Sequence, residues 1–254
     1  MTTTLPAHAG PIHLLLNPSI HTVLDRLDIR TNQRVLDVGA SEESTTLLAR
    51  LVGRYGSVTA VDADTGHLTD TAVINVHQLD LNRDPVPGHA AGYDHILARW
   101  PHGTLRDPAD LIEQMTTRLR PGGWLVLADI TTTAPRIYRA PDDESATLIH
   151  TVLQQAHRAL TGPHGATWTA DPETLLFSHG MAQHCIHTTT ETWTGADPGC
   201  RLLADVITHL RPRLNITNAD ADRFADLMTD PRVLLGSYER RIIHARAADK
   251  ARQP

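Results

Sequence analysis

The sequence contains no apolar run that approaches the roughly 20 residues needed to cross a membrane as a helix. Its first residues, MTTTLPAHAGPIHLLLN, lack the basic start and the long apolar core of a secretory signal peptide. We therefore expect a cytoplasmic protein without a membrane partner. Only two cysteines are present, Cys185 and Cys200, and in a reducing compartment we expect both to be free thiols.

The sequence also lacks an excess of basic residues. A formal net charge of −6 and a pI near 6.2 leave few spare cations to neutralise nucleic-acid phosphates. We therefore expect no nucleic-acid partner, although a local arginine patch stays open as an alternative. The 254 residues, 41% of them hydrophobic, suit one sizeable globular domain with a small appendage.

Clustered metal ligands are not apparent either. The 16 histidines are scattered, and none forms an i, i+4 pair beside a carboxylate, as a zinc site on a helix would need. His184 and His187 are three residues apart, but they lie in a stretch predicted to be a strand, where they point to opposite faces. We therefore predict no metal site.

Short apolar runs alternate with helical patterns in the first half of the chain. Such alternation predicts βαβ units, and hence a mostly parallel sheet with helices on both faces. The carboxyl ends of parallel strands meet at one edge of the sheet. The predicted strands begin at Arg34 and then span 57–61, 73–79, 93–98 and 124–128, and the predicted helices span 17–28, 44–51, a weak 67–71 and 107–119. Pro121-Gly122-Gly123 is predicted to be a turn.

The second half of the chain has longer helices and completes a predicted sheet of seven strands. Its predicted helices span 142–160, 172–179, 198–210 and 219–228, and its predicted strands span 183–192 and 233–245. Residues 1–30 are predicted to be an N-terminal arm and helix, and residues 31–254 the main domain. Within that domain, residues 198–228 form a predicted helical insertion or cap between the sixth and seventh strands.

Acidic residues follow three successive predicted strands, and each suits one part of an adenosyl cofactor. A glycine after Asp37-Val lets the backbone pass close beneath a ligand at this edge. Asp62 can accept hydrogen bonds from ribose hydroxyls, and Asp80 can accept one from an exocyclic amine. The alternative for Asp62 and Asp80 is an ordinary turn residue at a strand end.

These segments resemble the Rossmann-like class I methyltransferases that use S-adenosylmethionine. Val35-Leu-Asp-Val-Gly-Ala is similar to the family's first motif, and Val58-Thr-Ala-Val-Asp62 to its second strand. The most specific match is Leu119-Arg-Pro-Gly-Gly-Trp-Leu-Val-Leu-Ala-Asp129. The resemblance is good over residues 17–130 and weaker beyond, where the tail resembles actinobacterial small-molecule methyltransferases.

The resemblance implies methyl transfer from S-adenosyl-L-methionine to a small-molecule acceptor, a natural product of secondary metabolism among the options, and a homodimer is one possible assembly. It implies that Arg99 lines the floor near the sulfonium, with a surface charge as the alternative. The implied cofactor-binding residues are Asp37, Gly39, Ala40, Ser41, Asp62, Ala63, Asp80, Leu81 and Arg99.

The chain departs from the family's Gly-x-Gly-x-Gly pattern, because Ser41 and Glu43 replace the second and third glycines. A carboxylate suits a helix N-terminus, yet it would repel the cofactor's own carboxylate. Glu43 therefore faces solvent, pairs with the cofactor's ammonium group, or weakens binding. The same departure argues against a bound dinucleotide pyrophosphate, and the sequence contains no P-loop.

Methyl transfer depends chiefly on holding the acceptor in line with the methyl group, and some acceptors also need a base. The candidate bases are His13 and His102, and Trp100 and Tyr138 are candidate walls of an apolar acceptor pocket. A bystander role is the alternative for the two histidines, and a core or surface position is the alternative for Trp100 and Tyr138. A non-methylating enzyme of cyclase or isomerase type and a catalytically silent binding partner remain alternative functions on the same fold.

Overall fold

The structure is a computed structural model, and it describes residues 15–16, 23–24, 27–99, 107–131, 133–161 and 172–249. Among these residues no helix is both long and apolar enough to cross a membrane.

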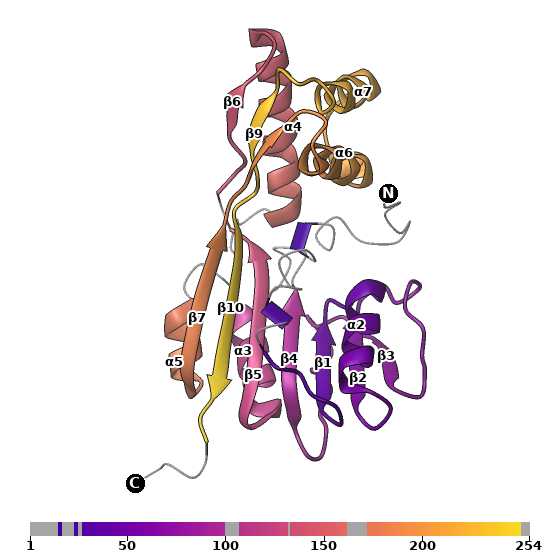
Figure 1. Ribbon diagram of the computed structural model, residues 1–254, viewed down its shortest axis with the longest axis vertical. Coiled ribbons are helices and arrows are strands. Elements are labelled where there is room, and N and C mark those ends of the chain that lie inside the picture. Colours follow the sequence, from indigo (N-terminus) through magenta and orange to yellow (C-terminus); the bar gives the residue numbers. More distant parts are fainter. Residues whose placement is uncertain are drawn as a thin grey trace.

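A seven-stranded sheet forms the lower part of the molecule (Figure 1). Its order is β3-β2-β1-β4-β5-β10-β7, and β10 runs antiparallel to both of its neighbours while the pairs from β3 to β5 are parallel. The predicted α/β fold with a mostly parallel sheet is confirmed. The strands are β1 (Arg34–Val38), β2 (Ser57–Asp62), β3 (Ile74–Gln78), β4 (Tyr93–Arg99), β5 (Leu119–Ile130), β7 (Met181–Thr189) and β10 (Arg240–Ala247).

Helices cover both faces of this sheet, because its central strands β1, β2, β4 and β5 are buried on both sides. Helix α2 (Glu42–Val52) packs Leu48 and Val52 against one face. Helices α3 (Pro108–Arg118) and α5 (Pro172–Ser178) pack against the other face, in a second cluster that includes β10. The alternating residues of each strand therefore belong to two separate apolar layers.

A second lobe stands beyond the carboxyl ends of β1, β4 and β5 (Figure 1). It combines three helices with a three-stranded sheet of order β6-β9-β8. The predicted helix 198–210 is confirmed, and the others agree with the prediction to within one or two residues. The elements of this second lobe are α4 (Asp143–Thr161), α6 (Pro198–Leu210), η1 (Arg211–Arg213), α7 (Asn218–Leu227), β6 (Ile137–Arg139), β8 (Thr192–Thr194) and β9 (Leu234–Gly236).

Two of the predicted elements are wrong. The predicted strand 233–245 is divided between β9 in the second lobe and β10 in the main sheet, because Ser237 N–H leaves the strand pattern and donates to the Glu191 carbonyl at 2.8 Å. The predicted helix 67–71 is an irregular loop. There the Thr71 hydroxyl accepts hydrogen bonds from two following backbone N–H groups, which competes with helix formation.

The predicted turn Pro121-Gly122-Gly123 lies inside β5 instead of preceding it. Gly122 has a φ of 72°, and the pairing of β5 with β4 shifts register beside it. The strand therefore begins before these residues and continues through an irregularity, while its apolar run begins at Trp124, as predicted.

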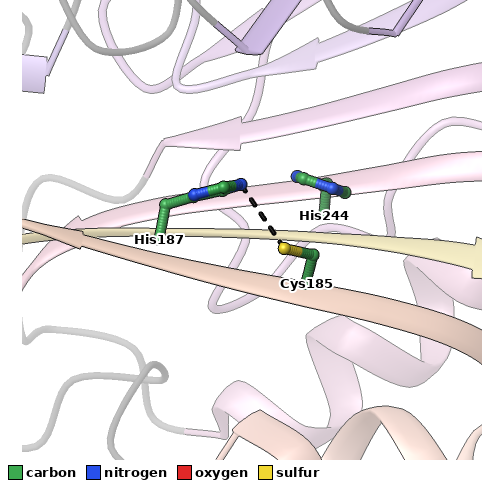
Figure 2. Close-up of side chains that lie close together, drawn as sticks. All are labelled: Cys185, His187 and His244. Carbon is green, nitrogen blue, oxygen red and sulfur yellow. Dashed lines mark hydrogen bonds between the residues drawn. The ribbon is translucent and has the colours of Figure 1, made fainter.

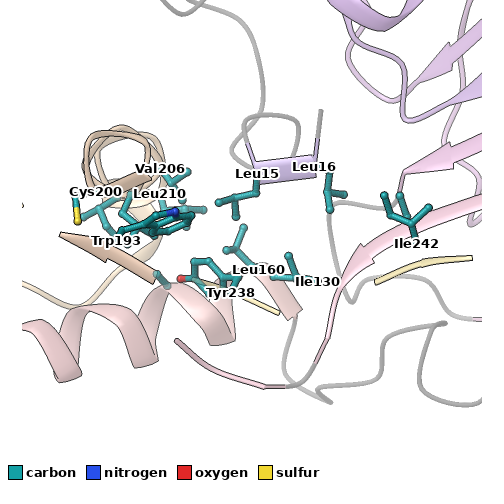
Figure 3. Packing of buried hydrophobic residues seen from close by; sticks show 14 of the residues in the cluster. Leu15, Leu16, Ile130, Leu160, Trp193, Cys200, Val206, Leu210, Tyr238 and Ile242 are labelled. Carbon is teal, nitrogen blue, oxygen red and sulfur yellow. The ribbon is translucent and has the colours of Figure 1, made fainter. Parts of the chain in front are cut away.

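One apolar cluster joins the main sheet to the second lobe. Leu15 and Leu16 are helical and fully buried, and Figure 3 shows them between Val206 and Leu210 on one side and Ile242 on the other. The predicted helix start at Asn17-Pro18 lies outside the described residues. Val23 and Leu24, within the predicted helix 17–28, are also helical and buried.

His95 on β4 makes stability depend on pH. It is 3% exposed, its Nε2 lies 3.0 Å from Gln33 Oε1, and burial lowers its pKa to about 4 from 6.5. The unfolded chain therefore binds more protons between pH 6.5 and 4, so stability is complete above pH 6.5 and falls as the pH drops to 4. This histidine contributes up to about 3 kcal/mol across that window.

We predict that His95→Gln flattens the pH dependence of the free energy of unfolding between pH 6.5 and 4, measured by urea denaturation. The exposed His209 on α6 provides the control, and His209→Gln should keep the wild-type slope. Equal slopes for the His95 and His209 variants would contradict the assignment.

Candidate functional site

The bend after β1 brings the ends of three strands together. Gly39 has a φ of 67°, and a Cβ at this position would lie 2.0 Å from the carbonyl oxygen of Arg99 at the end of β4. The N–H groups of Gly39 and Ala40 both point to the Val61 carbonyl on β2, at 2.9 and 3.1 Å. The glycine is required here because β4 passes directly beneath the bend.

A buried ion pair lies under this bend. Asp37 and Arg99 are both 0% exposed, and Arg99 Nη2 lies 2.6 Å from Asp37 Oδ1. Ser44 Oγ donates to Asp37 Oδ2 at 2.7 Å, so both carboxylate oxygens are engaged within the protein. Burial raises the pKa of Asp37, while Arg99 and Ser44 oppose this shift. The surface-charge alternative for Arg99 is wrong.

The serine that replaces the second glycine begins α2. Ser41 is 2% exposed, its Oγ accepts from the Ser44 N–H, and its own N–H donates to Ser44 Oγ, which together form a capping box. Arg99 Nη1 also donates to Ser41 Oγ at 3.2 Å. Glu43, in the first turn of α2, is exposed, which agrees with the solvent-facing alternative.

Asp62 lies at the end of β2 beside this bend. Its Oδ1 accepts from the Asp64 N–H at 2.9 Å. Burial raises the pKa of Asp62, while the hydrogen bond from the Asp64 N–H and the charges of His67 and Arg99 lower it. His67 Nε2 lies 3.1 Å from the Ala40 carbonyl oxygen, so it ties this loop to the bend.

His67 was not among the residues predicted for the site. Its local sequence contains no motif, and only the folded loop brings it across 27 residues to Ala40.

The remaining predicted adenosine contacts lie around the ends of β2 and β3. The carbonyl of Ala63 accepts from Gln78 Nε2 at 3.0 Å. Asp80 is exposed, accepts from the Asn82 N–H at 3.1 Å, and pairs with Arg83 at 3.5 Å, so it also shapes a turn. Leu81 is half-buried against the apolar cluster of α3.

Asp129 is a buried acid near the carboxyl end of β5. It is 7% exposed, and burial raises its pKa well above the ordinary value, although the Ile130 N–H donates to Oδ1 at 2.7 Å. The sequence placed this carboxyl at the same edge as Asp37 and Asp62, but assigned it no role.

Of the four predicted acceptor residues, only Tyr138 lies within the part of the chain that the structure describes. His13, Trp100 and His102 lie outside the described residues. Tyr138 lies on β6 in the second lobe and is 57% exposed, which favours the surface alternative over a pocket wall.

A family profile described as a methyltransferase domain matches residues 13–175, which is more than half of the chain. The chain belongs to this methyltransferase family. The matched segment contains Asp37, Gly39, Asp62 and Arg99, which form the edge described above. The search of curated proteins found no match at a significant level. The expectation of an S-adenosylmethionine-dependent methyltransferase is therefore confirmed at the level of family and fold.

Solved structures share the fold at low sequence identity. A methyltransferase candidate of Bacillus halodurans is 16% identical with a TM-score of 0.53, over 91% of this chain and 99% of that chain. The YcgJ protein of Bacillus subtilis is 15% identical with a TM-score of 0.53, over 92% of this chain and 99% of that chain. A third structure is a Haemonchus contortus phosphoethanolamine N-methyltransferase, solved with phosphomonomethylethanolamine and S-adenosylhomocysteine. It is 12% identical with a TM-score of 0.51, over 91% of this chain and 53% of that chain.

Gly39→Ala should lower the free energy of unfolding by at least about 2 kcal/mol, because it adds backbone strain and a contact with the Arg99 carbonyl. Gly180→Ala is the matched control. Gly180 also has a positive φ, of 74°, but nothing lies within 4 Å of its Cβ position, so the cost should be about 1 kcal/mol. Equal losses in urea denaturation would show that the close approach of β4 is unimportant.

Arg99→Met should cost about 3–5 kcal/mol of stability, because it leaves the Asp37 carboxylate buried without its cation. The double variant Asp37→Asn/Arg99→Met should recover roughly 1–2 kcal/mol relative to the sum of the single variants. Arg30→Met, which breaks an exposed pair with Asp28, is the control and should change stability little. Additive losses in the double variant would contradict the coupling.

Proposed function

We propose that this methyltransferase binds S-adenosylmethionine along the ends of β1, β2 and β3 and methylates a small-molecule acceptor. The position of Asp62 carries the proposal. Asp62 ends β2, the strand next to β1, and directly follows Val61, whose carbonyl accepts from the N–H groups of Gly39 and Ala40 in the bend. A ribose bound across this edge would need a hydroxyl acceptor there.

The described residues fit an adenosyl group on two counts. The Glu43 side chain is exposed and leaves the bend itself to Gly39, Ala40 and buried Ser41. Asp62 is half-buried at the end of β2, so the residue remains partly accessible at this edge. An anionic pyrophosphate would be repelled by the acids at this edge, whereas the adenosyl sulfonium compound has no phosphate.

Different residues would contact different parts of the cofactor. Asp62 accepts from the ribose hydroxyls, Asp80 and Leu81 flank the adenine, and the backbone of Gly39 supports the methionine part. Asp37 and Arg99 act indirectly, since their side chains are buried and bonded to each other, and they hold the bend in place. We assign both a positioning role instead of the direct contact that the family resemblance implies.

The bound cofactor supplies an activated methyl group, and the protein supplies position. The fixed bend holds the methyl donor. When an acceptor is held in line with the methyl group at the same edge, this orientation supplies most of the acceleration of methyl transfer. The second lobe stands over the carboxyl edge and offers the surface on which an acceptor can be held (Figure 1). Residues 198–228 belong to that lobe, which supports their proposed role as a cap.

A small-molecule acceptor is favoured by two observations. The net charge of −6 opposes a polyanionic nucleic-acid substrate. The Haemonchus contortus enzyme of the same fold holds a small phosphorylated amine. The assignment to secondary metabolism, the cytoplasmic location, the homodimer and the proton-accepting roles of His13 and His102 stay predictions.

A non-methylating enzyme on the same fold is the second candidate. It is favoured by Ser41, which occupies the second glycine position and is fully used as a helix cap and as a partner of Arg99. Mass-spectrometric detection of a methylated product after incubation with S-adenosylmethionine and candidate acceptors separates the two. Cofactor binding without any product would favour the second candidate.

Asp62→Asn should weaken the binding of S-adenosylmethionine at least fivefold, or by about 1 kcal/mol, through loss of a charged acceptor, measured by isothermal titration calorimetry. The amide can still accept from the Asp64 N–H, so the loop should stay folded. Asp64→Asn is the matched control, because Asp64 is exposed two residues away and its amide can still accept from the Gly66 N–H. Unchanged affinity in Asp62→Asn would refute the ribose assignment.

A further inference from the structure

Three side chains with metal-binding atoms meet on β7 and β10. Cys185 and His187 are two residues apart on β7 and so share a face, and His244 lies directly opposite Cys185 on β10. Figure 2 shows the three side chains converging. Cys185 Sγ lies 3.4 Å from His187 Nε2, and one ligand atom from each residue lies within 4.8 Å of the other two.

The shortest of these distances, between Cys185 and His187, matches what a shared metal ion imposes, and the remaining ones, all within 4.8 Å, require only small side-chain adjustments. With Zn–S near 2.3 Å and Zn–N near 2.0–2.1 Å, tetrahedral ligands lie roughly 3.4–3.6 Å from one another. A thiol–imidazole hydrogen bond would explain the contact between Cys185 and His187 alone. It would not explain the third ligand, His244, whose ring centroid lies 5.3 Å from that of His187.

We propose that Cys185, His187 and His244 form a binding site for Zn²⁺ or a similar thiophilic divalent cation. One thiolate and two imidazoles supply three of the four ligands of a tetrahedral zinc ion, and water can fill the fourth position. Cys185 is exposed and the two histidines are half-buried, so the ion can reach the site from solvent.

The surrounding sheet fixes the three ligands. Ile186, between the two β7 ligands, packs against the cluster that contains α3 and α5, which turns Cys185 and His187 to the opposite face. The Trp124 ring meets His244 edge-on, with centroids 5.8 Å apart. The nearest cation on the same face of β10, Arg246, donates to the Gly122 carbonyl and lies 3.7 Å from Asp249.

The proposed metal site is separate from the cofactor edge. His244 lies four residues along β10 from Arg240, which is paired with Ile130 at the carboxyl end of β5, so it is roughly 13 Å from that edge. The proposal therefore does not depend on methyl transfer. Its expected effect is structural, because the ion would cross-link the edge strand β7 to β10, its one neighbour in the sheet.

Titration of the purified full chain with Co²⁺ tests the site. We expect one ion per chain, with thiolate-to-cobalt charge-transfer absorption in the near ultraviolet and tetrahedral d–d bands in the visible, both lost on addition of Zn²⁺. Cys185→Ala should abolish the charge-transfer band, and His244→Ala should weaken binding at least tenfold. Saturating Zn²⁺ should raise the melting temperature of the wild type but not of Cys185→Ala.

Two variants serve as matched controls. His184→Ala removes an adjacent histidine on the opposite face of β7, and Cys200→Ala removes the other thiol, which is buried in α6. Both should bind Co²⁺ as the wild type does. Absence of a charge-transfer band in the wild type, or an equal band in Cys185→Ala, would overturn the proposal and leave Cys185 and His187 as a hydrogen-bonded pair.

Discussion

The buried ion pair between Asp37 and Arg99 is the interaction on which the functional edge depends. Neither charge reaches water, so each is tolerated only because the other, together with the hydroxyls of Ser41 and Ser44, satisfies it. The pair joins the ends of β1 and β4 to the first turn of α2. The position of the Gly39 bend, and of any ligand resting on it, follows from this link.

The ion pair also explains the departure from the glycine-rich family motif. In this chain a serine at the second glycine position gives α2 a side-chain cap and gives Arg99 an acceptor, neither of which a glycine could provide. Both carboxylate oxygens of Asp37 are bonded within this network, so they cannot meet a ligand. Asp62, at the end of the neighbouring strand β2, is only half-buried and keeps part of its surface accessible. In this chain Asp37, Arg99 and Ser41 therefore support the edge, and Asp62 is left to meet a ligand.

The two lobes depend on each other through the chain crossings. Glu191, beside β8, accepts from Trp193 Nε1 in the second lobe and pairs with Arg240 at the start of β10 in the main sheet. The same apolar cluster continues from α2 through Leu15 and Leu16 to α6. The second lobe is therefore held over the carboxyl edge by both packing and charge, which gives the proposed acceptor surface a fixed position.

The sequence by itself determined the parallel sheet, its carboxyl edge and most of the helices. Continuous apolar runs that end in Asp37, Asp62 or Asp129 are local patterns, and so is Asp197-Pro198 at the start of α6. Only the tertiary structure decided the long-range contacts: Arg99 with Asp37 across 62 residues, His67 with Ala40, and His244 with Cys185 and His187. Periodicity reports the face on which a side chain lies, whereas the partner it meets depends on strand order and register, which are set by packing of the whole chain.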